Sequence, residues 1–223
     1  MLNPNIDALI ISAGYSSRMK DFKPLMLFEG FPFIISVICK TSQICQNLYV
    51  VTGYRDKDIR DEVRRWLDKQ PEQQALKFVN LSEDQWKMLH SKVNFIHNEQ
   101  YKLGMFSSLK IGLKHIGKTD WILYHFVDQP HIPADFYTLF KKQLDNQYHW
   151  IQPRYQKKNA HPILIRNDLG NELAKADLTS DLKSFSKNRN IKKKFWNCDY
   201  PQVLSDFDTP DNFYSPGEAY GHL

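Results

Sequence analysis

Cysteine is scarce in this sequence of 223 residues, which contains only Cys39, Cys45 and Cys198 and no CxxC pair. An odd number of separated thiols disfavours a disulfide framework and a structural zinc site. Such cysteine usage is typical of proteins that stay in a reducing compartment. We therefore expect a cytoplasmic protein.

Long apolar runs and strong charge are also lacking. The longest apolar stretch, "FPFIISVIC", is far shorter than the roughly 20 residues that cross a bilayer. The first residues, "MLNPNIDALIISAG", place no basic residue before their short apolar run, so we expect neither export nor a membrane partner. The net charge of +5 is dispersed and too mild to indicate nucleic acid, but it suits an anionic small substrate.

Short apolar runs alternate with amphipathic stretches, which predicts an α/β protein with a mostly parallel sheet covered by helices. The expected strands are "DALIIS", "LYVVTG", "VNFIHN", "WILYHFV", "WIQPRY" and "PILIR". The expected helices are Phe33 to Thr41, Lys57 to Leu67, Phe106 to Ile116, Ala134 to Leu144 and Ser180 to Asn188. We expect one domain over residues 1–223, with an insertion at 68–92 and a loosely held tail at 215–223.

The loop after the first strand, "SAGYSSRMKDFKP", has the composition of an anion site. It lacks the GxGxxG pattern of dinucleotide-binding loops, and no glycine directly precedes Lys23 as a Walker loop requires. What is present is a turn of small residues whose backbone amides can approach a ligand, followed by Arg18 and Lys23 five residues apart. A surface turn with solvated cations is the alternative interpretation.

Six motifs in order give the sequence a family resemblance. "LIISAGYSSRMKDFKPLMLFEG", "VVTGYRDKDI", "NEQYKLGMFSSLKIGL", "VDQPHIP", "AHPILI" and "DFDTPDN" resemble the MobA-like nucleotidyltransferases, and the cytidylyltransferase branch more than the guanylyltransferase branch. The resemblance implies a three-layer, Rossmann-like nucleotide-diphospho-sugar transferase fold with a mixed, mostly parallel sheet. It also implies magnesium-dependent transfer of a nucleotidyl group from an NTP, with release of pyrophosphate.

The resemblance assigns catalytic roles at two strand edges. Arg18 matches a residue that holds the β- and γ-phosphates, and Lys23 one that holds the α-phosphate. Magnesium prefers oxygen ligands, and Asp128 and Asp208 match the family's metal ligands. Asp128 could instead cap the turn after its strand, and Asp208 could belong to a solvated acidic turn with Asp206 and Asp211 as neighbours.

Recognition of the base is implied for small residues at three of these edges: Ser12, Ala13 and Gly14, then Gly53, then Gly104, Ser107 and Ser108. Glycine and serine are also ordinary at the start of a helix, so the last group has a plain structural interpretation. The "SAG" sequence favours CTP over GTP, because GTP enzymes of the family usually carry a second glycine there.

The acceptor side departs from the family pattern. Gln129 and His161 match its acceptor-binding residues, although a histidine before proline is often only a turn residue. Ala160 replaces the glycine of a GHP motif, Lys20 replaces a loop glycine, and "ADLTSDLKS" lacks the expected glycines and arginine. The cations Arg154, Lys157 and Lys158 could meet an acceptor phosphate or form a solvated cluster.

Three hypotheses follow from these motifs. The first is transfer of CMP to the phosphate of molybdopterin or molybdenum cofactor, and the second is the same chemistry on a sugar- or alcohol-phosphate. The third is a nucleotide- or cofactor-binding partner of a molybdoenzyme without turnover. The partners that we expect besides the NTP and the acceptor are a molybdoenzyme or its chaperone, and we expect no nucleic acid.

Overall fold

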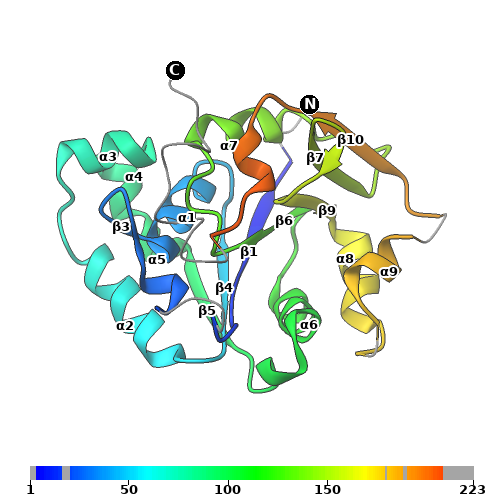
Figure 1. Ribbon diagram of the computed structural model, residues 1–223, viewed down its shortest axis with the longest axis horizontal. Helices are drawn as coiled ribbons and strands as arrows, with labels where there is room; N and C mark the ends of the chain where they lie inside the picture. Colours follow the sequence, from blue (N-terminus) through cyan, green and yellow to red (C-terminus); the bar gives the residue numbers. More distant parts are fainter. Residues whose placement is uncertain (1–3, 17–20, 179, 188–189, 208–223) are drawn as a thin grey trace.

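An eight-stranded mixed sheet forms the centre of the protein in the computed structural model, which describes residues 4–16, 21–178, 180–187 and 190–207 (Figure 1). The strand order is β10-β7-β9-β6-β1-β4-β5, and β8 pairs with β7 outside this row. The family resemblance predicted a mixed, mostly parallel sheet, and this prediction is confirmed.

The parallel half of the sheet consists of β1 (Ile6–Ser12), β4 (Leu48–Thr52), β5 (Val93–His97) and β6 (Trp121–Phe126). All seven residues of β1 are buried, since this strand lies between β4 and β6 and has helices on both faces. A strand that is buried on both faces reads as a continuous apolar run, which is why the sequence revealed it.

The other half of the sheet reverses direction at β9 (Ile163–Arg166), which is antiparallel to both β6 and β7 (Trp150–Tyr155). Strand β10 (Lys193–Asn197) pairs in parallel with β7, and β8 (Lys158–Asn159) forms a short hairpin with it. The carboxyl ends of β1, β4, β6, β7 and β10 therefore point to the same edge of the sheet.

Helices cover both faces, giving three layers (Figure 1). One face packs against α1 (Phe33–Thr41), α2 (Asp56–Leu67) and α7 (Ala134–Lys141), and the other against α6 (Met105–His115), α8 (Asn167–Lys175) and α9 (Leu182–Ser186). No helix within the described ranges is long and apolar enough to cross a membrane.

Residues 68–92, the predicted insertion, contain the short helices α3 (Gln73–Val79), α4 (Glu83–Lys87) and α5 (Leu89–Lys92). They adjoin the hairpin of β2 (Leu27–Phe28) and β3 (Phe31–Pro32). The remaining short turns are η1 (Lys23–Leu25), η2 (Tyr101–Leu103) and η3 (Pro201–Leu204). The predicted tail at 215–223 lies outside the described residues.

The predicted strands and helices all occur, with ends shifted by a few residues, whereas β10, α8 and the β2–β3 hairpin were not predicted. Helix α8 contains Gly170, which lowers helix propensity. A Cβ at this position would lie 2.8 Å from Ile122 Cδ1, so the glycine lets the helix approach β6 closely. Strand β10 begins with two lysines and lies at the edge of the sheet, where charged side chains are tolerated.

Candidate active site

A cleft of about 360 Å³ opens where β1 and β6 end and α6 begins. The parallel registers place Ser12 beside Thr52 and Ile11 beside Phe126, so segments far apart in the sequence meet at one edge. Ligands of open α/β sheets collect at this edge. Among the predicted site residues, the cleft is lined by Ser12, Ala13, Gly14, Lys23, Gly104, Ser108 and Asp128.

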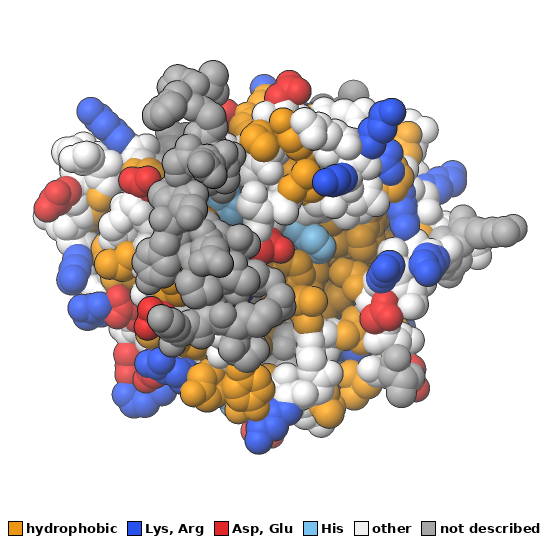
Figure 2. All heavy atoms as spheres, in the orientation of Figure 1, with side chains coloured by type: hydrophobic (Ala, Val, Ile, Leu, Met, Phe, Trp, Pro, Cys, Tyr) orange, Lys and Arg blue, Asp and Glu red, His pale blue; other side chains and the backbone are white. Residues whose placement is uncertain are grey.

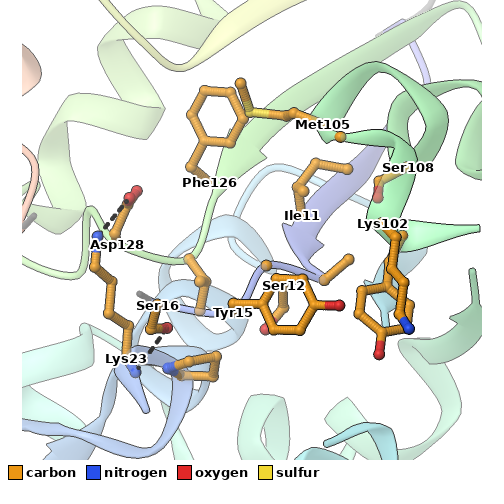
Figure 3. Close-up of a pocket in the computed structure, with 16 residues that line it drawn as sticks. Ile11, Ser12, Tyr15, Ser16, Lys23, Lys102, Met105, Ser108, Phe126 and Asp128 are labelled. Carbon is orange, nitrogen blue, oxygen red and sulfur yellow. Dashed lines mark hydrogen bonds and ion pairs between the residues drawn. The ribbon is translucent and has the colours of Figure 1, made fainter. Parts of the chain in front are cut away.

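One end of the cleft carries paired charges (Figure 3). Lys23 Nζ lies 3.5 Å from Asp128 Oδ2, and the backbone N–H of Lys23 donates to Ser16 Oγ at 3.2 Å. The two side chains are only 10% and 23% exposed, so the pair is stronger than a solvated surface pair. The lysine and carboxylate predicted to act together are therefore in contact.

Two predicted residues, Arg18 and Asp208, lie outside the described residues. The chain next to Asp208 is described as far as Phe207, whose backbone N–H donates to the carbonyl oxygen of Asp128 at 3.2 Å. The roles of Arg18 and Asp208 stay predictions.

The other end of the cleft is aromatic. The ring of Tyr15 lies 5.3 Å from that of Tyr101, which also lines the cleft, and 5.0 Å from that of Tyr54. Tyr15 is 47% exposed, so its ring is available to a ligand. The sequence singled out no aromatic residue for this site, although Tyr15 directly follows Gly14.

Gly53 shapes the aromatic end without lining the cleft. A Cβ at this position would lie 2.5 Å from Tyr101 Cβ and 2.9 Å from the carbonyl oxygen of Ala13. Neither of these atoms lies at the end of a flexible side chain, so they could not move aside easily. The glycine predicted beside the base therefore allows Tyr101 to pack against the first loop, and its direct contact with a base stays a prediction.

Asn98 organises the turn that begins α6. Its buried side chain donates to Ser107 Oγ at 3.0 Å and to Ser108 Oγ at 2.9 Å. Ser108 lines the cleft, whereas the Ser107 hydroxyl contacts the carbonyl oxygens of Gln100 and Gly104 within the turn. Sequence reasoning missed Asn98, although its position directly after the β5 strand was a usable signal.

Gly104 has a conformational reason to be glycine. Its φ of 94° lies in the left-handed region, and it separates η2 from α6. Gly104 lines the cleft together with Met105 and Ser108 of α6, and its contact with a base stays a prediction.

Metal binding would use few protein ligands here. The described residues contain no group of three or more His, Cys, Asp or Glu side chains that could hold a metal. Asp128 is the only acid among the described residues that line the cleft. Magnesium commonly takes one or two carboxylates and completes its shell with phosphate oxygens and water, so this donor set fits that ion when a triphosphate is present.

The predicted acceptor residues lie on either side of β6. The ring of His161 lies 4.7 Å from the Phe126 ring, and burial lowers the pKa of His161 to about 4, so its imidazole is neutral at pH 7. Gln129 is buried behind the cleft, where its Nε2 lies 3.4 Å from the carbonyl oxygen of Val203 and supports the loop after Asp128. The acceptor roles of both residues stay predictions.

Comparison with known proteins identifies a related sequence and several structures of similar fold. The chain is 24% identical over 220 residues to the molybdenum cofactor cytidylyltransferase of Escherichia coli K12, covering 98% of both proteins. Its fold matches the inositol-1-phosphate CTP transferase of T. maritima with a TM-score of 0.65, 10% identity and coverage of 92% and 90%. It also matches a Mycobacterium tuberculosis protein solved in complex with manganese, with a TM-score of 0.63, 14% identity and coverage of 94% and 96%.

The MobA-like NTP transferase domain matches residues 8–193, a span that contains all but the first two residues of β1, the Lys23–Asp128 pair and the turn at Gly104. The chain belongs to the MobA-like NTP transferase family of nucleotidyltransferases.

Proposed function

We propose that the protein transfers CMP from CTP to the phosphate of molybdopterin or the molybdenum cofactor and releases pyrophosphate. The observation that carries this proposal is the polarity of the cleft, with the Lys23–Asp128 pair at one end and Tyr15 and Tyr101 at the other. A nucleoside triphosphate has the same polarity, with an anionic chain at one end and a flat base at the other.

The reaction needs charge stabilisation rather than a protein nucleophile. An oxygen of the acceptor phosphate attacks the α-phosphorus of CTP, a new P–O bond forms, and the bond to the bridging oxygen of pyrophosphate breaks. Lys23 would hold the α-phosphate, and Arg18 the β- and γ-phosphates. When bound, Mg²⁺ would neutralise phosphate charge, with Asp128 and Asp208 as its protein ligands. A preorganised charge of this kind is worth on the order of a hundredfold in rate.

The base would lie between the first loop and the start of α6. Backbone groups of Ser12, Ala13 and Gly14 supply hydrogen bonds from one side, and the Gly104 turn and Ser108 border the other. Stacking on an exposed aromatic ring adds about 1–3 kcal/mol per base. This arrangement supports binding of a pyrimidine or purine, and the likeness to a cytidylyltransferase favours CTP over GTP.

A sugar- or alcohol-phosphate is the second candidate acceptor, supported by the structural likeness to an inositol-1-phosphate CTP transferase. We further propose that the enzyme acts in the cytoplasm and passes its product to a molybdoenzyme or its chaperone.

Pyrophosphate release tests the proposal directly. The purified protein is mixed with Mg²⁺, each of the four NTPs in turn, and molybdopterin, glycerol phosphate or inositol phosphate. We expect pyrophosphate to be released with CTP and molybdopterin, and the rate of release to fall at least a hundredfold in Asp128→Ala. Asp84→Ala, which removes a carboxylate with 92% of its side chain exposed on α4, is the matched control and should retain full activity. Tight CTP binding without release of pyrophosphate from CTP in the presence of any of these acceptors would reject the catalytic role and leave a binding role.

A further inference from the structure

Next to the cleft, strands β7 and β10 carry partly exposed and exposed side chains on one face of the sheet. His161 contacts Phe126 at the cleft wall, and the backbone N–H of the residue before it, Ala160, donates to the carbonyl oxygen of Pro153 on β7 at 3.0 Å. There Gln152 Nε2 donates to the carbonyl oxygen of Ala160 at 3.0 Å, which fixes the segment before His161 against β7. Ala160 and His161 therefore connect the end of β6 with β7 on this face of the sheet.

Arg154 and Phe195 lie at the far end of this face. Side chains alternate along a strand, so Arg154 points to the same side as Gln152. The guanidinium carbon of Arg154 lies 3.8 Å above the ring of Phe195 on β10, and Phe195 is 37% exposed. Figure 2 shows apolar side chains around a hollow near the centre of this face, and Lys and Arg side chains gathered on the side where Figure 1 draws β7 and β10.

The guanidinium of Arg154 is held in place but has no acidic partner among the described residues. Its Nε donates to Asn159 Oδ1 at 2.7 Å, and Phe195 supports the plane from below. These contacts leave the two terminal NH₂ groups directed at no carboxylate. The other arginines within the described ranges all pair with aspartate or glutamate, and they are Arg55, Arg60, Arg64, Arg65 and Arg166. A guanidinium fixed in this way presents a planar fork to an oxygen-rich ligand.

The distance across the face sets the size of the ligand. Neighbouring strands lie about 4.8 Å apart, so β7 is about 10 Å from β6 and β10 is about 14 Å from it. This span suits a fused bicyclic heterocycle joined to a phosphate by a short arm, with the phosphate at the Asp128 end. An acceptor without a ring would not reach Phe195 and Arg154, so these two side chains would make no contact with the ligand.

We propose that the face formed by Phe126, His161, Gln152, Arg154 and Phe195, here called the acceptor face, binds the planar heterocycle of the acceptor, and that Arg154 recognises the carbonyl or anionic oxygens at its far edge. The proposal rests on the proposed function for the position of the acceptor phosphate. It makes Arg154 a determinant of acceptor specificity that plays no part in NTP binding.

Neopterin monophosphate, whose ring fluoresces, probes the acceptor face without turnover. We expect Arg154→Met to weaken its binding about tenfold, because the substitution removes the charge-assisted hydrogen bonds of the guanidinium group. Lys158→Met removes the same charge from the same hairpin and should change binding less than twofold. CTP affinity should be unchanged in both variants, and glycerol phosphate should compete poorly with the probe.

Equal effects of the two substitutions, a parallel loss of CTP affinity in Arg154→Met, or equal competition by glycerol phosphate would each overturn the inference. Absence of probe binding by the unsubstituted protein would overturn it as well, even if pyrophosphate is released with another acceptor. Conversely, Arg154-dependent probe binding without pyrophosphate release from CTP and molybdopterin would support the acceptor face and reject the proposed reaction. The two failures are therefore distinguishable.

Discussion

Replacing Lys40 with methionine should stabilise the protein at neutral pH. Lys40 lies on α1 and is only 2% exposed, and its Nζ donates to the carbonyl oxygen of Pro130 at 2.6 Å. The nearest ring is that of Phe78, 4.6 Å away, and within the described part of the chain no carboxylate forms an ion pair with it. A buried ammonium with so few polar partners is costly in free energy.

The size of that cost follows from protonation. Burial lowers the pKa of Lys40 from 10.5 to about 8, while the nearby carboxylate of Glu29 partly opposes the shift. Below pH 8 both the folded and the unfolded chain carry the proton, and the folded state bears the full penalty, about 3 kcal/mol. Between pH 8 and 10.5 the unfolded chain binds more protons, so the contribution of this group to stability rises with pH through that window.

Methionine keeps the length of the side chain and removes the charge. It also loses the hydrogen bond to Pro130, worth about 1–2 kcal/mol, but Ser36 Oγ still donates to the same oxygen at 3.1 Å. We expect Lys40→Met to be about 1–2 kcal/mol more stable at pH 7, and this advantage should shrink as pH approaches 10. Urea unfolding of both proteins at pH 7 and pH 9.5 measures the difference. A loss of more than 2 kcal/mol at pH 7 would refute the reasoning, because the ammonium would then be stabilising.

Three further predictions concern the cleft and its edge. Tyr15→Ala should weaken CTP binding about tenfold by calorimetry and leave tripolyphosphate binding unchanged; equal losses for both ligands would exclude stacking. Gly53→Ala should raise the KM for CTP at least tenfold by displacing Tyr101, whereas Gly117→Ala, where a Cβ meets no atom within 4 Å, should not change it. The pKa of His161 is about 4 in the folded protein and 6.5 in the unfolded chain, so the free energy of unfolding should fall as pH drops from 6.5 towards 4. This fall should be smaller in His161→Asn, and an equal dependence of the unfolding free energy on pH in both proteins would contradict the pKa of His161.

Most of the sheet was predictable because its central strands are buried on both faces. The apolar runs of β1 and β6 are continuous and only seven and six residues long, and a run of this length favours a buried strand over a buried helix. Strand β10 was missed because an edge strand needs apolar residues on one face only, and its lysines conceal them. Helix α8 was missed because Gly170 serves a close contact with Ile122, which only the tertiary structure reveals.

The candidate site was predictable where a residue type is dictated by ligand chemistry. Asp128 follows the end of β6, and the loop after β1 leads to η1, where Lys23 Nζ lies 3.5 Å from Asp128 Oδ2. Residues that act by packing were harder to recognise, since Tyr15 and Asn98 belong to no ligand class by themselves. Gly53 was found through the resemblance, but its close approach to Tyr101 depends on two loops that are distant in sequence.

Residues 68–92, which the sequence predicts to be an insertion, contact the loop after Asp128 through a row of aromatic rings. Phe78 on α3 stacks on Phe31 at 5.7 Å and lies 6.1 Å from Phe28. The Phe28 ring lies in turn 5.6 Å from that of Phe207, whose backbone N–H donates to the carbonyl oxygen of Asp128. Phe78 also packs over Lys40, which holds the next part of the same loop at Pro130. Because tightly packed side chains transmit displacement, we expect substitutions at Phe78 to disturb the loop that carries Asp128.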